Sequence, residues 1–232
     1  MSYRMSPTDT INHIKNMIQI YDTIKEVFER ELLCVFKDFD TNPHDIVKLS
    51  ILLHDVGKLA QEYINTDYFD HSAEYVIKAF WENYDIDITN TNNKEIEKIK
   101  GIVSFVIKEH HEYRHANNNS SISKNISVTF LENYILTSIN NLLQKNIRII
   151  KKEQNDDNLL SKFDKKRNKT PLYCGIESIY VLNIVTFIDN LEAIKSRGNQ
   201  NKTELMRILT TLYPYNVIYN QIIKEGDIVW KT

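Results

Sequence analysis

The residues from 51 to 58, ILLHDVGK, place an imidazole beside a carboxylate at the end of an apolar run. The apolar run indicates that the backbone is buried here, and a buried charge without a partner is energetically costly. His54 and Asp55 therefore need a partner that satisfies both side chains. A divalent metal ion is such a partner, because imidazole nitrogen and carboxylate oxygen are both ligands of first-row metals. The segment thus predicts a metal centre.

Two further residues of the same segment suit this chemistry. Gly57 is typical of a helix end, where a residue often turns left-handed. Lys58 follows His54 by four residues and so lies on the same side of a continuing turn, where its ammonium group is well placed to hold a phosphate. Chance produces an HDxGK string on the order of once in a thousand chains of this length, so chance explains the string poorly.

Whether the segment with His54 and Asp55 forms a metal site depends on the other histidines of the chain. His110 and His111 both extend apolar stripes of a helix predicted over 95–113. Two adjacent histidines at the end of a buried helix are hard to satisfy with ordinary hydrogen bonds. His13 lies beside the apolar stripe of the first predicted helix, where a single histidine is more often a core or boundary residue than a ligand. His71 falls at the beginning of a further predicted helix.

Three more polar residues lie on or beside predicted helices. Asp189 stands within an otherwise apolar helix predicted over 176–196, so its carboxylate requires a cation or a hydrogen-bond donor. A salt bridge at an exposed helix edge is the alternative to a metal at this position. His44 falls in the first turn of the helix predicted over 43–55 and is expected at the surface. Asp70 is expected to cap the helix that His71 begins.

Apolar residues recur at helical spacing along most of the chain, which predicts an all-α helical bundle. The chain has only 5 glycines and 4 prolines, which favours long helices over a turn-rich β fold. The polar stretch over 85–94 is predicted to be a connection. The predicted helices span 7–28, 43–55, 71–84, 95–113, 126–149, 176–196 and 203–212.

The 232 residues are predicted to form a single domain, with a core over 7–196 and a C-terminal appendage over 197–232. Within the appendage, the tail over 213–232 is predicted to form a small hairpin. The hydrophobic content of 42% and the charged content of 26% are typical of a soluble globular protein. No signal-peptide pattern and no apolar stretch of membrane length occur, and the 2 cysteines form no disulfide framework, so we expect a cytoplasmic protein without a membrane partner.

The formal net charge of −2 provides no general basic field, so binding of nucleic acid would depend on a local patch. Such a patch is present between residues 145 and 169, where nine lysines and arginines face four acidic residues. A solvated loop and a phosphate-binding segment explain this stretch about equally well. The candidate nucleic-acid-binding residues are Lys162, Lys165, Lys166 and Arg167.

Collected in chain order, these residues resemble the HD superfamily of metal-dependent phosphohydrolases, which are all-helical and named after the adjacent His-Asp pair. Within that superfamily the chain is most similar to the HD nuclease of CRISPR type I interference systems, as a stand-alone subunit without its helicase. The resemblance spans residues 13–189. It rests on His13, the segment from His54 to Lys58, the segment from Phe69 to Ser72, the His110–His111 pair and Asp189.

The resemblance implies two metal ions, from among Mn, Fe, Co, Ni and Mg, and assigns their ligands. The first metal would be bound by His13, His54, Asp55 and Asp189, and the second by Asp55, His71, His110 and His111. Asp55 would bridge the two ions, which would activate a water molecule for attack on a phosphodiester. Asp55 and Lys58 are the candidate catalytic residues, with Lys58 stabilising charge on the phosphate. The chain departs from the family where Asp189 is followed by Asn190, Leu191 and Glu192 instead of small hydroxyl residues.

The function that the resemblance implies is hydrolysis of single-stranded DNA, with RNA as a further candidate substrate, by an endonuclease or an exonuclease in CRISPR interference. The sequence contains no GxxxxGK[ST] phosphate loop, so a separate helicase subunit and an RNA-guided complex are the expected partners. Two alternatives remain open. One is an HD-type phosphohydrolase that acts on small nucleotides, and the other is a non-catalytic HD scaffold.

Overall fold

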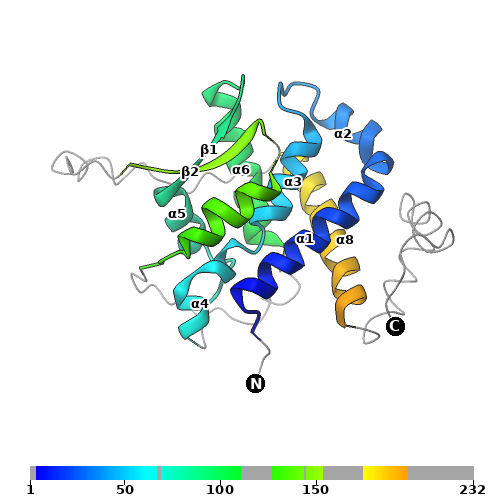
Figure 1. The fold of residues 1–232 in the computed structure, drawn as a ribbon. Coiled ribbons are helices and arrows are strands. Elements are labelled where there is room, and N and C mark those ends of the chain that lie inside the picture. Colours follow the sequence, from blue (N-terminus) through cyan, green and yellow to red (C-terminus); the bar gives the residue numbers. More distant parts are fainter. Residues whose placement is uncertain (1–3, 67–68, 111–126, 144, 154–174, 198–232) are drawn as a thin grey trace.

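The computed structural model describes residues 4–66, 69–110, 127–143, 145–153 and 175–197, and these are mostly helical (Figure 1). The mainly helical content supports the prediction of an all-α bundle only in part, because a small sheet is also present. One small sheet, formed by β1 (Tyr84–Ile88) and β2 (Ile147–Lys151), was not predicted. The helical elements are α1 (Pro7–Ile24), η1 (Lys25–Phe28), α2 (Glu29–Val35), α3 (Pro43–Leu53), η2 (Val56–Leu59), α4 (Gln61–Asn65), α5 (Glu74–Asn83), α6 (Asn93–Glu109), η3 (Tyr134–Ile139), η4 (Asn140–Leu142) and α8 (Ile176–Arg197).

Helix α3 lies at the centre of the bundle and packs against α1, α6 and α8. Its start is defined by Asn42, whose side chain accepts a hydrogen bond from the backbone N–H of His44, and by Pro43 in the first turn. The residues from Ile51 to Leu53 are completely buried, as the apolar run predicts. This burial carries the end of α3, and therefore the His-Asp pair, into the interior.

Helices α1 and α8 cross each other and pack together, and both contact α3 (Figure 1). The start of α1 is stabilised by a capping box, in which Ser6 accepts from the backbone of Asp9 and Asp9 accepts from the backbone of Ser6. Ile14, Met17 and Tyr21 form the buried stripe of α1. This packing brings the first and the last described helices together although they are far apart in the sequence.

The two-stranded sheet corrects the prediction of a polar connection over 85–94. Tyr84, Ile86 and Ile88 are buried and alternate with Asp85 and Asp87, which is the period-two pattern of a strand. Strand β1 pairs antiparallel with β2, so that Ile86 faces Ile149 and Asp87 faces Arg148. The second pair places opposite charges across the strands, which is favourable.

The helix predicted over 126–149 is confirmed only over 132–142, and the described residues on either side of that stretch are not helical. The described residues there form the short π-helix η3 and the single 3₁₀ turn η4, followed by β2. The Asn140 side chain explains part of the change in structure, because its amide accepts from the backbone N–H of Ile149 and donates to the backbone carbonyl of Ile149. These bonds hold the helical turn against the edge of β2.

Two local predictions are also wrong. Helix α5 begins at Glu74 and not at residue 71, and Asp70 instead accepts hydrogen bonds from the backbone N–H and the hydroxyl of Ser72, which closes a turn before the helix. His44 is not a free surface residue. Its side chain is only 15% exposed, bonds the hydroxyl of Tyr21 at 2.6 Å and pairs with Glu29.

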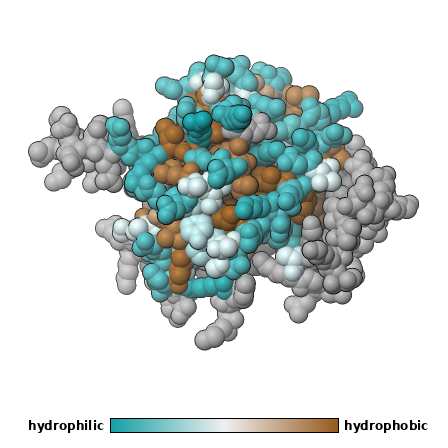
Figure 2. All heavy atoms as spheres, in the orientation of Figure 1, coloured by the Kyte–Doolittle hydropathy of each residue, from teal (hydrophilic) through white to brown (hydrophobic). Residues whose placement is uncertain are grey.

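The predicted helix over 203–212 and the predicted C-terminal hairpin lie outside the described residues. Within the part of the chain that the structure describes, no helix combines the length and the apolar character needed to cross a membrane. The face shown in Figure 2 mixes hydrophilic residues with smaller groups of hydrophobic ones, as is normal for a protein surface.

Candidate metal centre

The His-Asp pair lies directly after helix α3. His54 caps the helix, since its backbone N–H donates to the carbonyl of Ser50, and Asp55 then precedes the 3₁₀ turn η2. Both side chains are inaccessible, with 1% of each exposed. The buried apolar run therefore produces the arrangement that the sequence predicts, a polar pair held inside the protein.

The carboxylate of Asp55 is surrounded by imidazole nitrogens, and each of its oxygens faces a different pair. Oδ1 lies 3.2 Å from Nε2 of His71 and 3.4 Å from Nε2 of His110. Oδ2 lies 3.3 Å from Nε2 of His54 and 3.8 Å from Nε2 of His13. Two groups of potential metal ligands result, in each of which the ligand atoms lie within 4.8 Å of one another, and Asp55 belongs to both.

Hydrogen bonds on the far side of the rings direct these nitrogens inward. Nδ1 of His54 lies 2.7 Å from the carbonyl of Ile51, and Nδ1 of His110 lies 2.8 Å from the carbonyl of Ile107. Because a carbonyl only accepts, Nδ1 carries a hydrogen in both rings, and the lone pair of the neutral ring is on Nε2. Nε2 of His54 is buried and makes no hydrogen bond in the described structure, so its position fits a metal ligand.

We call His13, His54 and Asp55 the first ligand group, and Asp189 on α8 extends it through its contact with His13. His13 on α1 places Nε2 3.2 Å from Oδ1 of Asp189 on α8, and its Nδ1 lies 2.6 Å from Oε2 of Glu192. Burial lowers the pKa of His13, but the hydrogen bonds to Asp189 and Glu192, together with the charge of Asp55, outweigh it and raise the pKa to about 9. The concentration of negative charge here favours a cation.

The same contacts lower the pKa of both α8 carboxylates. Burial tends to raise the pKa of Asp189, but the hydrogen bond from His13 and the charge of His13 hold it well below its usual range. Burial also opposes ionisation of Glu192, and the hydrogen bond and charge of His13 again prevail and lower its pKa. Both side chains are therefore anionic at neutral pH.

Lys58 makes a contact that was not predicted, although it follows Asp55 by three residues. Its Nζ lies 2.5 Å from Oδ2 of Asp55 and 3.8 Å from the sulfur of Met5, and 11% of its side chain is exposed. The ammonium group thus lies at the centre and partly balances the charge of Asp55. Its contact with a phosphate remains a prediction.

Gly57 is required for a reason other than the predicted one. It lies within η2, and its backbone is not left-handed. A Cβ atom at this position would lie 2.1 Å from the carbonyl oxygen of His71, which is far inside van der Waals contact. Only a hydrogen fits, so Gly57 lets the turn after the His-Asp pair approach the backbone that carries His71.

The structure brings together most of the residues that the sequence selects. His13, His54, Asp55, His71, His110, Asp189 and Lys58 all lie at this centre. Glu192 was not selected, although its spacing of three residues from Asp189 on a predicted helix places both carboxylates on one face. The residues His111, Lys162, Lys165, Lys166 and Arg167 lie outside the described part of the chain.

Comparison of the chain with models of protein families, with curated proteins and with solved structures found no match. The site consists of a buried carboxylate between two groups of imidazole nitrogens, with a lysine and a second carboxylate beside it.

A metal ion that binds this centre is expected to stabilise the fold. Adding Mn²⁺ or Ni²⁺ to chelator-treated protein at a hundredfold excess over its Kd should raise the free energy of unfolding by about 2.7 kcal/mol. Each kcal/mol raises the melting temperature of a chain of this size by about 2–4 °C. Thermal unfolding followed by circular dichroism, with and without metal, measures the shift.

Two histidine variants provide the control for this measurement. His54→Gln removes a nitrogen that faces Asp55 and should lose most of the shift, whereas His44→Gln lies away from the centre and should keep it. Equal shifts in the two variants would place the metal elsewhere in the protein.

Proposed function

We propose that this protein is a metal-dependent phosphohydrolase of the HD type and that it acts as a nuclease on single-stranded DNA. The observation that carries the proposal is the position of Asp55, whose two oxygens face two separate pairs of histidine Nε2 atoms. A carboxylate placed in this way is suited to bridge two cations. The HDxGK string and the order of histidines along the chain support the same assignment.

When bound, a pair of divalent ions would supply an activated water nucleophile and positive charge for the oxygens of a phosphodiester. His13, His54 and Asp189 would hold one ion, and His71 and His110 the other, with Asp55 shared between them. The described donor set contains only imidazole and carboxylate groups, which suits Mn, Fe, Co, Ni or Mg and is unlike a thiolate zinc site.

Lys58 has a second role in this proposal. Its ammonium group forms an ion pair with Asp55 within the centre, and the lysine side chain remains partly accessible to solvent. A phosphate that enters the centre meets this cation, which stabilises the negative charge that develops during hydrolysis. The carbonyl-bonded rings of His54 and His110 keep their Nε2 atoms directed at the two oxygens of Asp55, so the residues need little rearrangement when the substrate binds.

The main support for single-stranded DNA as the substrate comes from the sequence. The excess of lysine and arginine between residues 145 and 169 would bind a phosphate backbone, and the chain has no phosphate loop with which to open a duplex by ATP hydrolysis. A stacked duplex also bends poorly into a site whose main carboxylate is 1% exposed. A helicase subunit and an RNA-guided complex would therefore provide the opened strand.

Matched single-stranded and blunt double-stranded DNA test the substrate. With Mn²⁺, Ni²⁺ or Mg²⁺ and equal nucleotide concentrations, we expect cleavage of the single strand with the blunt duplex largely spared. Cleavage should weaken steeply as salt rises, because binding of a polymer releases counterions. A time course on denaturing gels measures both effects.

Nucleoside triphosphates in the same series separate the two kinds of phosphohydrolase. Hydrolysis of triphosphates with little response to salt, and no cleavage of DNA, would replace the nuclease by a nucleotide phosphohydrolase with the same centre. Equal rates on single-stranded and duplex DNA would contradict the need for a helicase partner. A chain that binds metal and cleaves none of these substrates would support the scaffold alternative.

A further inference from the structure

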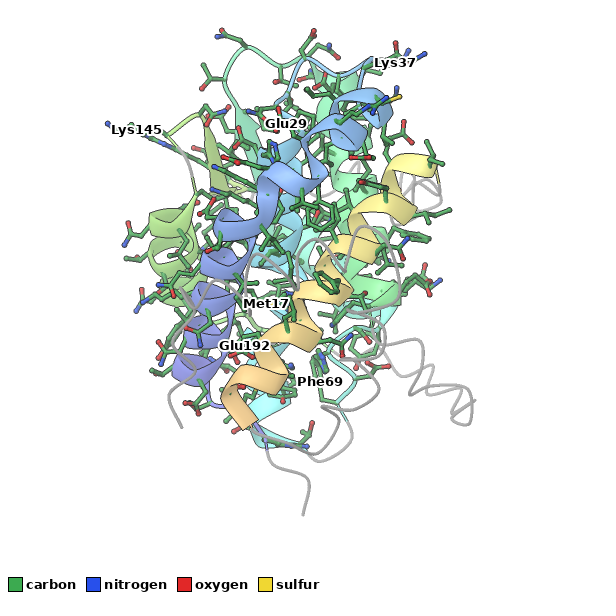
Figure 3. The ribbon with its side chains drawn as sticks, turned by 90° about the vertical axis from the view of Figure 1, so that its right-hand side faces the viewer. Met17, Glu29, Lys37, Phe69, Lys145 and Glu192 are labelled. Carbon is green, nitrogen blue, oxygen red and sulfur yellow. The ribbon has the colours of Figure 1, made fainter. Side chains whose placement is uncertain are left out.

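Glu192 is a buried carboxylate that the proposed function leaves without a role. It lies on α8 (Figure 3), one turn after Asp189, and only 3% of the residue is exposed. A carboxylate at this depth is tolerated only when its oxygens are paired. Because Glu192 lies beside α1, side chains of that helix can pair with its oxygens.

Both oxygens of Glu192 are held by named groups. Oε2 lies 2.6 Å from Nδ1 of His13 and accepts from the hydroxyl of Ser196 at 3.3 Å. Oε1 accepts from the side-chain amide of Asn16 at 3.1 Å. His13 and Asn16 are one turn apart on α1, so the carboxylate spans two positions of the facing helix and has little freedom to rotate.

This contact determines how His13 is presented to the centre. With Nδ1 committed to Glu192, the other nitrogen, Nε2, faces Asp189 at 3.2 Å and Asp55 at 3.8 Å. His54 and His110 are held differently, because their Nδ1 atoms lie against backbone carbonyls of their own helices. A carboxylate acceptor carries a full charge, which makes the ring a stronger ligand than a neutral carbonyl does.

We propose that Glu192 is the positioning residue of the first ligand group. It holds His13 with Nε2 directed at the centre and strengthens the binding of a divalent cation by His13, His54, Asp55 and Asp189. The proposal rests on the metal centre of the proposed function and adds a difference between its histidines. His13 depends on a side chain outside the ligand set, whereas the rings of His54 and His110 are held by backbone carbonyls.

Metal binding by the full chain tests this role without any nucleic acid. Isothermal titration of chelator-treated protein with Mn²⁺ should show one class of site weakened about 10- to 100-fold in Glu192→Gln, the usual effect of losing such a partner. The glutamine has the same shape but no charge. Glu82→Gln, an exposed position on α5, is the matched control and should keep the wild-type Kd.

A spectroscopic measurement separates positioning from a general loss of structure. The Nδ1–H proton of His13 should give a hydrogen-bonded signal in proton NMR of wild-type protein loaded with Mg²⁺, assigned by its loss in His13→Gln. In Glu192→Gln this signal should move upfield, because a neutral amide oxygen is a weaker acceptor. Peripheral methyl signals should not move.

A second variant guards against misfolding. Asn16→Ala leaves Glu192 and His13 in place and removes one of the bonds that hold the carboxylate, so it should weaken the same class of site by a smaller factor. If both variants fold, wild-type Kd values in both would overturn the role of Glu192. If Glu192→Gln does not fold, a wild-type Kd in Asn16→Ala is enough to overturn that role. A wild-type chain that binds neither Mn²⁺ nor Ni²⁺ would overturn the metal centre itself, which is a distinct result.

Discussion

Replacing Asp55 by alanine should abolish metal-dependent hydrolysis with every cation tried. Asp55 alone among the described ligands belongs to both groups, so its loss removes a ligand from each proposed ion. Removing a single group that stabilises transition-state charge already costs about 10²–10³-fold in rate. We therefore expect a loss of about 10³-fold or more in the rate of cleavage of a labelled single strand.

Two further variants show whether the lost activity reflects the missing carboxylate or a disrupted fold. Asp55→Ala leaves Lys58 buried beside an empty volume, so Asp55→Asn, which keeps the size of the side chain, should be measured with it. Asp87→Ala, at an exposed position on β1, is the control and should retain full activity. Cleavage near the wild-type rate by folded Asp55→Asn and Asp55→Ala would exclude the whole centre.

Substituting Gly57 by alanine should disrupt the fold and the centre together. The new Cβ would meet the carbonyl oxygen of His71 at 2.1 Å and the Cα of His71 at 2.8 Å, and backbone atoms cannot turn aside as a flexible side chain can. Overpacking of this kind costs about 1–3 kcal/mol, and we expect the upper end because the clash is with backbone. Separation of the two segments would also move His71 away from Asp55.

Urea denaturation of the metal-free chain measures the first effect, and titration with Mn²⁺ measures the second. Gly57→Ser should behave like Gly57→Ala, since the first added carbon already makes the clash. A change of less than about 0.5 kcal/mol in the free energy of unfolding, which is typical of surface substitutions, would show that the two segments can separate freely.

The helical part of the fold was predictable because its signals are local. The stripes of α1 and α6 and the apolar run of α3 follow from spacing within single segments. The sheet was not predictable in the same way, because β1 and β2 are short and their partners lie far apart in the sequence. The alternation of Tyr84, Ile86 and Ile88 was available as a signal, but a five-residue strand next to helices is easily taken for a connection.

The residues of the candidate site were also predictable only where their sequence signals are local. His54 and Asp55 were identified from their own neighbours, and the apolar stripe of α6 indicated His110. The contact between His13 and Glu192 depends instead on how α1 lies against α8, which no local pattern specifies. The true requirement for Gly57 was hidden for the same reason, since the obstacle to a side chain comes from a segment beyond η2.

The order of these ligands along the chain has a consequence for synthesis. Asp55, His71 and His110 all lie in the first half of the sequence, whereas His13 meets Asp189 only through the last described helix. That helix, α8, also packs against α1, α3 and α6, so the bundle closes only when it has been added. A nascent chain, which emerges from its N-terminus, therefore has no complete centre until translation has passed α8. We therefore expect any product truncated before α8 to lack Asp189 and, with it, the proposed hydrolytic activity.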